Sequence, residues 1–139
     1  MISLKERKKN MNYIIEQLDT IKNKIKINDT LFAYSIITIH IILVGSGILY
    51  LLLCKVDKIY FIFILFWILI IFLHFYFNGC VLTRIERHYL KDDKWYGPPI
   101  IPFLMLGYPI SKQEAINFIY ICSFITTTII MIKLFLYLY

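Results

Sequence analysis

The chain has 139 residues, of which 60% are hydrophobic and 17% are charged, and its mean hydropathy is +0.71. A soluble domain of this size needs more polar surface, so the composition excludes an ordinary soluble protein and predicts a membrane protein. The net charge is +6. In a membrane protein, basic residues in excess usually set the topology and attract anionic lipid headgroups, and we favour these roles over binding of nucleic acid.

Residues 1–30 predict a basic amphipathic helix. Leu4, Met11, Leu18 and Ile25 recur every seven residues and place an apolar stripe on one face of it. A helix that lies on the membrane surface fits this pattern, and a short coiled coil or a dock for a protein partner fits it equally well. The basic residues expected at the membrane surface are Lys5, Arg7, Lys8, Lys9, Lys22, Lys24 and Lys26.

Three apolar runs, 31–54, 59–82 and 115–138, are each long enough to cross a hydrocarbon core of ~30 Å as a helix. The polar link 55–58 between the first two is so short that it predicts an antiparallel hairpin. The predicted fold class is therefore all-α, a three-span transmembrane protein with an N-terminal amphipathic helix.

Residues 83–114 predict an interfacial segment that is rich in Pro and Gly. Its apolar part, 100–106, is too short to span and is expected at the interface, with a re-entrant loop as the alternative. Ser111 and Glu114 predict a capping box at the start of the third span. Lys and Arg are more numerous before the first span and in 83–114 than in the short link, which predicts the N-terminus inside and the C-terminus outside.

Three basic residues stand within the spans, namely His40, His74 and Lys133. His40 lies near the middle of the first span, where an ionisable group raises a hypothesis of function, and we favour a neutral imidazole bonded to a neighbouring helix. Lys133 is close enough to the end of the third span that we expect it to snorkel outward. The three cysteines, Cys54, Cys80 and Cys122, form no CxxC pair and are expected to act as small apolar residues.

The stretch 74–86, HFYFNGCVLTRIE, leads from the second span into the charged segment. We expect Gly79 to end the span in a left-handed conformation, and Thr83 and Glu86 to form a capping box that starts an interfacial helix. This interpretation makes the motif structural, because one helix stops, turns and restarts at the membrane surface. Its residues are His74, Asn78, Gly79, Cys80, Thr83 and Glu86.

Two functional interpretations compete with the structural one. His74, Cys80 and His88 could contribute to a metal site, although their spacing matches no standard zinc pattern. Alternatively, His74, Asn78 and Glu86 could line a polar site with Ser or Thr residues of the third span, where catalysis would need a nucleophile and an activating base. Because no established catalytic motif supports such a site, we expect no enzyme activity, no metal, no cofactor and no small-molecule substrate.

Written as H-x3-N-x-C-x-L-T-x-x-E, the stretch from His74 to Glu86 resembles a motif in small multi-span membrane proteins. One set is a bacterial family of unknown function, and another is formed by uncharacterised membrane proteins of large nucleocytoplasmic DNA viruses. Val81 stands where the bacterial form often has Pro, and the 29 Ile against two Ala are typical of an AT-rich genome, so the viral set is favoured. The resemblance implies no activity. It implies a virion membrane protein that lies beneath a capsid.

The sequence thus predicts a non-enzymatic structural or scaffold protein of a virion or host internal membrane, in contact with capsid or other membrane proteins. A small accessory subunit of an organellar membrane complex is the first alternative. A membrane enzyme or transporter that uses His40 and His74 is the second. Polar groups of the first and third spans that all face His74 would favour this last alternative, whereas polar groups that face separate helices would favour the structural roles.

Overall fold

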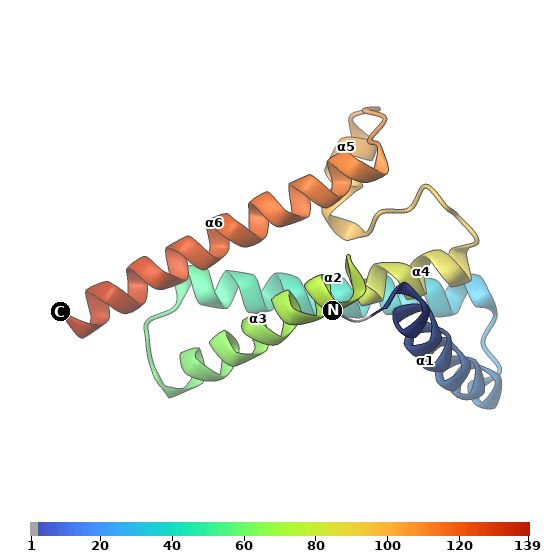
Figure 1. Ribbon diagram of the computed structural model, residues 1–139, viewed down its shortest axis with the longest axis horizontal. Helices are drawn as coiled ribbons and strands as arrows, with labels where there is room; N and C mark the ends of the chain where they lie inside the picture. Colours follow the sequence, from blue (N-terminus) through green and yellow to red (C-terminus); the bar gives the residue numbers. More distant parts are fainter. Residues whose placement is uncertain (1–2) are drawn as a thin grey trace.

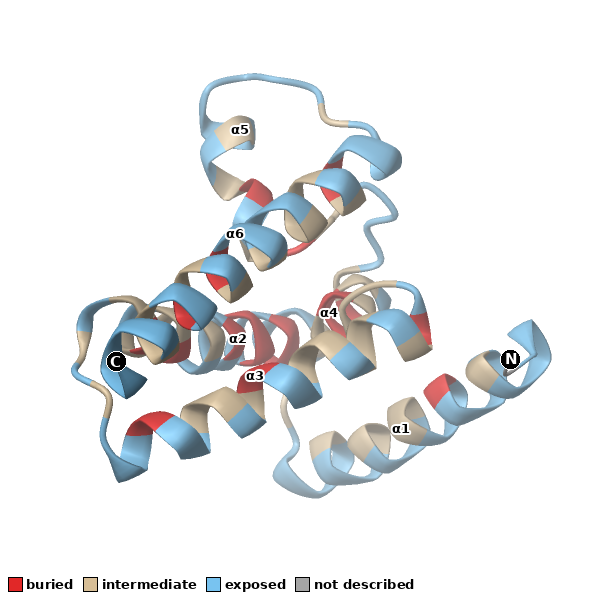
Figure 2. Ribbon diagram, turned by 60° about the vertical axis from the view of Figure 1, so that its left-hand side comes forward, coloured by how far each residue is buried: buried red, intermediate tan, exposed pale blue. Residues whose placement is uncertain are grey.

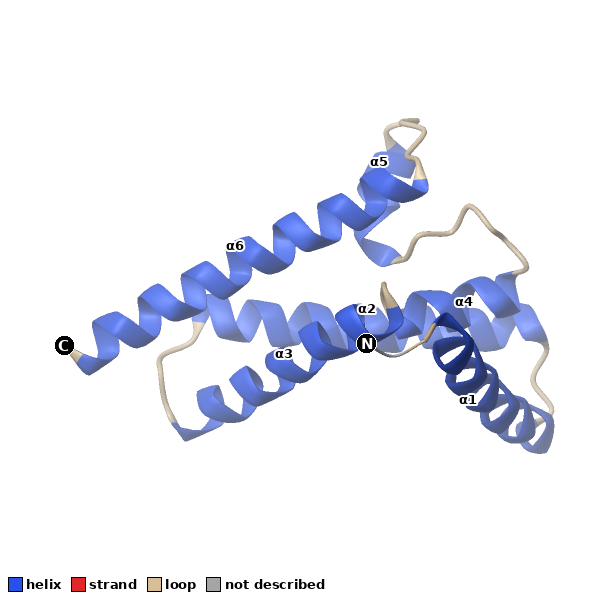
Figure 3. Cartoon of the chain, in the orientation of Figure 1, coloured by secondary structure: helices blue, strands red, loops and turns tan. Residues whose placement is uncertain are grey.

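The protein is a helical bundle in the computed structural model, which describes residues 3–139. Residues 1 and 2 of the predicted N-terminal helix lie outside the described residues. Within the described chain 82% of the residues are helical and no strand occurs (Figure 3). The elements are α1 (Leu4–Ile25), α2 (Asp29–Leu53), α3 (Lys58–Phe77), α4 (Val81–Leu90), the 3-10 helix η1 (Pro98–Ile100), α5 (Ile101–Met105) and α6 (Lys112–Leu138).

Three of the described helices, α2, α3 and α6, are long and apolar enough to cross a membrane, as the sequence predicts. They leave most of their apolar surface uncovered by protein, which is compatible with a multi-pass integral membrane protein. α2 and α3 run antiparallel, and α6 passes beside them toward the C-terminus (Figure 1). α1 and α4 lie together at the end of the molecule away from the 54–57 turn and the C-terminus, and α5 lies apart from them beside the start of α6 (Figure 1).

Hydrogen-bonded caps fix where the long helices begin and end. The capping box predicted at the start of the third span is present, since the Glu114 N–H donates to the Ser111 hydroxyl at 3.3 Å and the Ser111 N–H donates to the Glu114 carboxylate at 2.8 Å. At the end of α3 the left-handed cap is Asn78, with φ of 53°, and Gly79 follows with φ of 133°. The predicted stop is therefore real, but two residues share it, because Asn tolerates the left-handed region almost as well as Gly.

The middle of the apolar stripe of α1 packs against the bundle. Met11 is 6% exposed, whereas Leu4 and Ile25, at the two ends of the stripe, are 81% and 55% exposed. The Tyr89 hydroxyl also donates to Asp19 of α1 at 3.1 Å. Contact with the chain's own helices therefore occupies part of the stripe that was expected to face a membrane or a partner (Figure 2). The buried residues at this contact form one hydrophobic cluster, which comprises Met11, Phe32, Ala33, Ile36, Phe77, Ile85 and Tyr89.

Lys133 does not extend outward as expected. Its ammonium group donates to the carbonyls of Leu51, Leu52 and Cys54 at 3.0, 3.2 and 2.6 Å, and it lies 5.0 Å from the centre of the Tyr60 ring. The last carbonyls of a helix lack partners within the helix and carry partial negative charge. A cation from α6 that supplies their hydrogen bonds is thus more stable there than one that extends into the headgroups.

Candidate active site

The short helix α4 lies antiparallel along the first half of α2. Phe32 and Tyr89 make an edge-to-face contact with ring centroids 4.9 Å apart, and Lys91 pairs with Asp29 at 3.3 Å. α4 is strongly amphipathic, and it turns Thr83, Glu86 and Tyr89 toward the protein. An ionisable residue, Glu86, is therefore packed on the inner face of this helix.

Glu86 is fully buried, and both of its carboxylate oxygens accept a strong hydrogen bond. Oε1 lies 2.7 Å from Nδ1 of His40, and Oε2 accepts from the indole Nε1–H of Trp95 at 2.6 Å. With Nδ1–H of His40 as the donor, Glu86 accepts one hydrogen bond on each oxygen and orients the imidazole ring. A buried charge is tolerated when donors of this kind replace its water.

The other ring nitrogen of His40 faces a thiol. Nε2 lies 3.5 Å from Sγ of Cys80, the residue that immediately precedes α4. Burial would by itself raise the pKa of the Cys80 thiol, but the side chains of His40 and His74 outweigh this effect, and the pKa falls to about 5. The backbone amide of Thr83 contributes in the same direction, as expected for a thiol at a helix N-terminus. Cys80 is thus in polar contact with a histidine, which differs from the small apolar residue expected from the sequence.

The capping box predicted for Thr83 and Glu86 is wrong. α4 begins at Val81, so Cys80 and not Thr83 holds the N-cap position, and the Glu86 carboxylate bonds with His40 and Trp95 instead. Two side-chain donors compete better for a buried carboxylate than one backbone N–H, because the charge-assisted bonds are made away from water.

Thr83 is left with an unpartnered hydroxyl. Its side chain is buried, and Oγ1 has no hydrogen-bond partner in the described part of the chain. The loop after α4 closes on it at Gly97, where a Cβ atom would lie only 2.4 Å from Oγ1. A buried hydroxyl of this kind costs free energy unless something else bonds with it.

A largely apolar cavity of about 320 Å³ lies beside the thiol. Cys80 and Thr83 line it together with polar residues from all three long helices. The Nδ1–H of His74 donates to the Ile70 carbonyl, 2.9 Å away, which leaves its Nε2 free of that bond. His40 of α2 and Ser123 and Thr126 of α6 therefore face the same space as His74 of α3. Other polar residues of the first and third spans do not, because Ser35, Thr38, Ser46 and Thr128 bond to carbonyls of their own helix and Thr127 accepts from Trp67. The arrangement that would favour an enzyme or transporter is thus present in part.

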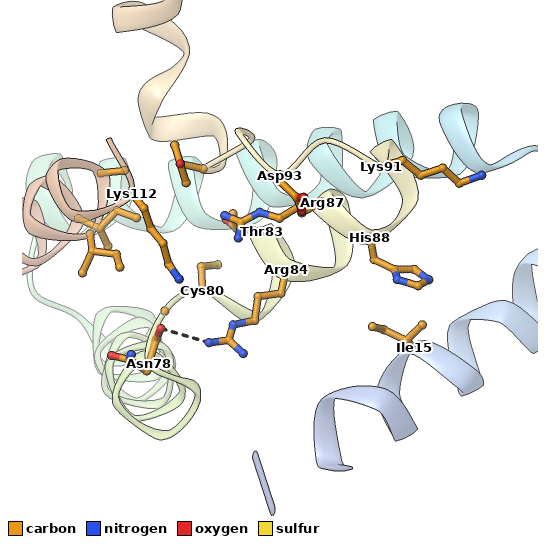
Figure 4. A pocket seen from close by; sticks show the side chains of 15 residues that line it. Ile15, Asn78, Cys80, Thr83, Arg84, Arg87, His88, Lys91, Asp93 and Lys112 are labelled. Atoms are coloured by element: carbon orange, nitrogen blue, oxygen red, sulfur yellow. Dashed lines mark hydrogen bonds between the residues drawn. The ribbon is translucent and has the colours of Figure 1, made fainter. Parts of the chain in front are cut away.

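A second cavity of about 660 Å³ lies on the outer side of the same residues and has basic walls (Figure 4). Cys80 and Thr83 line both cavities, so the thiol stands where the two meet. Arg84, Arg87 and Lys112 are turned toward this second space (Figure 4).

Asn78, Gly79 and His88 line the basic cavity together with Cys80, but none of them bonds with the thiol in the described part of the chain. Asn78 ends α3 and its carbonyl accepts from Arg84 at 3.3 Å, while Gly79 lines only the basic cavity. His88 stacks edge to face on Tyr89. No group of three or more His, Cys, Asp and Glu side chains between residues 3 and 139 is arranged to hold a metal ion.

Sequence reasoning missed two features of this site. It gave the Trp95 indole no partner, whereas the indole donates to Glu86, and it did not foresee the contact between His40 and Cys80. The sequence did contain one indication that Glu86 is buried. Glu86 falls on the same helical face as Thr83 and Tyr89, and a solvated carboxylate is not expected on that face.

Comparison with known proteins gives no match. No family model matches the chain, and neither a curated protein nor a solved structure is significantly similar to it. The resemblance of the stretch from His74 to Glu86 therefore stays a prediction.

Proposed function

We propose that the protein is a membrane enzyme that transfers or hydrolyses acyl groups through Cys80. The observation that supports the proposal is the series of contacts from Glu86 through His40 to Cys80. Thiol catalysis needs a nucleophile, a base within reach of it and a group that orients the base, and these three residues supply one of each. His40 belongs to α2 and the other two belong to the α4 region, so docking of α4 assembles the site.

In the proposed reaction the Cys80 thiolate attacks the carbonyl carbon of an ester, and a C–S bond forms as the carbonyl electrons move to oxygen. The unpartnered hydroxyl of Thr83 is available to donate to that oxygen. The ester C–O bond then breaks, and His40 Nε2–H gives its proton to the leaving alcohol. Water attacks the thioester next, His40 takes its proton, and the C–S bond breaks to release the acid and restore the thiolate.

The test is acylation of the full chain in mild detergent by a medium-chain p-nitrophenyl ester. We expect a burst of p-nitrophenol and an acyl group on Cys80 that hydroxylamine removes, and we expect both to be lost in Cys80→Ala and His40→Gln. Cys122 is a matched control, since this thiol lines the same apolar cavity and makes no hydrogen bond with a histidine among the described residues. Equal labelling of Cys122 and Cys80, or labelling that survives His40→Gln, would rule the proposal out.

The structural role expected from the sequence is the second candidate. It is supported by the same buried contacts, because the pairing of Glu86 with His40 and Trp95 also holds α4 and the following loop on α2. In this proposal the protein is a scaffold of a viral inner membrane, with the N-terminus inside and the basic residues of α1 on anionic headgroups. Stoichiometric capsid or membrane proteins after native purification, together with failure of the acylation test, would favour it.

A further inference from the structure

The two cavities that meet at Cys80 differ in chemistry. The inner one is lined mainly by apolar residues of α2, α3 and α6, and the outer one carries Arg84, Arg87, Lys91 and Lys112 against a single carboxylate, that of Asp93. A molecule that reaches Cys80 from both sides therefore needs an anionic part and an apolar part, with its reactive atom between them.

Two cations of the outer cavity, Arg84 and Arg87, are held in place by backbone carbonyls, and Lys91 is paired with Asp29. Arg84 donates to the Phe77 carbonyl at 2.5 Å, and Arg87 donates to the Trp95 carbonyl through Nε and Nη2 at 2.9 and 2.8 Å. In the part of the chain that the structure describes, no ion pair involves Arg84, Arg87 or Lys112. Burial and repulsion from Arg87 and Arg7 also lower the pKa of the Arg84 guanidinium, as expected for cations that lack a counter-ion.

Fixed guanidinium groups are suited to a phosphate, because their remaining N–H groups form strong bonds with its oxygens. The apolar cavity is suited to a hydrocarbon chain, because its walls are apolar except for the polar groups described above. We propose that the site binds an ester lipid with an anionic phosphate headgroup, the phosphate at Arg84, Arg87 and Lys112 and one acyl chain in the apolar cavity.

This assignment rests on the proposed function and adds its substrate class. In a glycerophospholipid the ester carbonyl lies a few bonds from the phosphate and begins the acyl chain, so it would fall where the two cavities meet, at Cys80 and Thr83. A coenzyme A thioester separates its phosphates from the carbonyl by a long arm, so it would not fill both cavities with the carbonyl at the thiol.

The test uses the fluorescence of the two tryptophans, because Trp67 lines the apolar cavity and Trp95 bonds with Glu86. The full chain carrying Cys80→Ala, which binds lipid without turning it over, is reconstituted in phosphatidylcholine bilayers. Phosphatidylglycerol or phosphatidylcholine with brominated acyl chains is then titrated in. We expect brominated phosphatidylglycerol to quench at roughly tenfold lower mole fraction, as one or two charge-assisted hydrogen bonds predict.

Lys112→Gln is the decisive variant, since it removes a cation of the outer cavity that makes no hydrogen bond within the described residues. It should reduce the preference for phosphatidylglycerol several-fold, whereas Lys94→Gln in the loop after α4, an equal loss of charge at a residue that lines neither cavity, should leave it unchanged. Equal quenching by the two lipids, or equal loss in both variants, would overturn the assignment. Loss of the preference on adding inorganic phosphate alone would also overturn it, because the ligand would then be free phosphate.

Failure of this assignment and failure of the proposed function are distinguishable. Acylation of Cys80 by the p-nitrophenyl ester requires no lipid, and lipid binding in Cys80→Ala requires no thiol. If Cys80 is acylated but the protein shows no preference for phosphatidylglycerol, the proposed thiol enzyme stands and the phospholipid substrate is wrong.

Discussion

Glu86 and His40 are 46 positions apart in the chain, yet their side chains meet at 2.7 Å in a region where Glu86 has no exposed surface. The pair joins the only carboxylate on the inner face of α4 to the only histidine of α2. Most of the properties proposed for the molecule depend on this contact.

Glu86→Ala should destabilise the protein by about 3–5 kcal/mol, because it leaves His40 and the Trp95 indole buried without their acceptor. Glu86→Gln retains an acceptor and should cost less. Thermal unfolding in detergent measures both, with the exposed Glu16→Gln as the control. A melting temperature of Glu86→Ala equal to that of Glu16→Gln would contradict the contact.

The reactivity of Cys80 should depend on pH in a way that follows its lowered pKa. A thiol with a pKa of about 5 is already thiolate at neutral pH, so alkylation by iodoacetamide should be half-maximal near pH 5 and level by pH 7. In His40→Gln the midpoint should move up toward the ordinary thiol value of about 8.5. The measurement uses Cys54→Ser and Cys122→Ser to leave one thiol, and a midpoint that ignores His40 would count against the pairing.

Gly97→Ala should be more destabilising than Gly107→Ala. Both glycines have positive φ, 93° and 73°, so an alanine at either one carries backbone strain of about 1–3 kcal/mol. Only at Gly97 would the new Cβ also lie 2.4 Å from the Thr83 hydroxyl, while nothing lies within 4 Å at Gly107. The difference between the two variants in unfolding free energy therefore reports the clash, and equal values would show that the loop does not close on Thr83.

Thr83→Ala distinguishes two roles of the Thr83 hydroxyl, a part in the proposed reaction and a helix cap. A helix cap would cost about 0.5–2 kcal/mol on removal, whereas a hydroxyl that has no partner should cost little. We expect nearly unchanged stability together with slower acylation of Cys80. A large loss of stability with normal acylation would contradict the role proposed for the hydroxyl.

Lys133→Met should destabilise the junction between α6 and the end of α2 by roughly 1.5–3 kcal/mol, the value of a hydrogen bond to a charged group. Hydrogen exchange at residues 51–54 would report the loss, because their carbonyls lose the cation. Lys55→Met, an exposed lysine in the adjacent turn, is the control. Unchanged protection in Lys133→Met would mean that the lysine does not cap α2.

The fold could be predicted from local patterns, and the site could not. Length and apolarity mark α2, α3 and α6, and the pair Ser111 and Glu114 marks the start of α6, because these signals depend on nearby residues alone. The partners of Glu86 depend instead on how α4 lies along α2, and the capping box drawn from Thr83 and Glu86 was the local interpretation of the same residues. Where a local and a long-range partner compete for one carboxylate, only the packed structure decides between them.

His40 is held by α4 at two points, the thiol that precedes the helix and the carboxylate on its second turn. Because one ring contacts α4 at two points, the helix cannot slide along α2 by a turn or rotate about its own axis while either contact remains. A reagent that modifies Cys80 would therefore do more than block a nucleophile. It would also break one of the two contacts that set the register of α4 on α2.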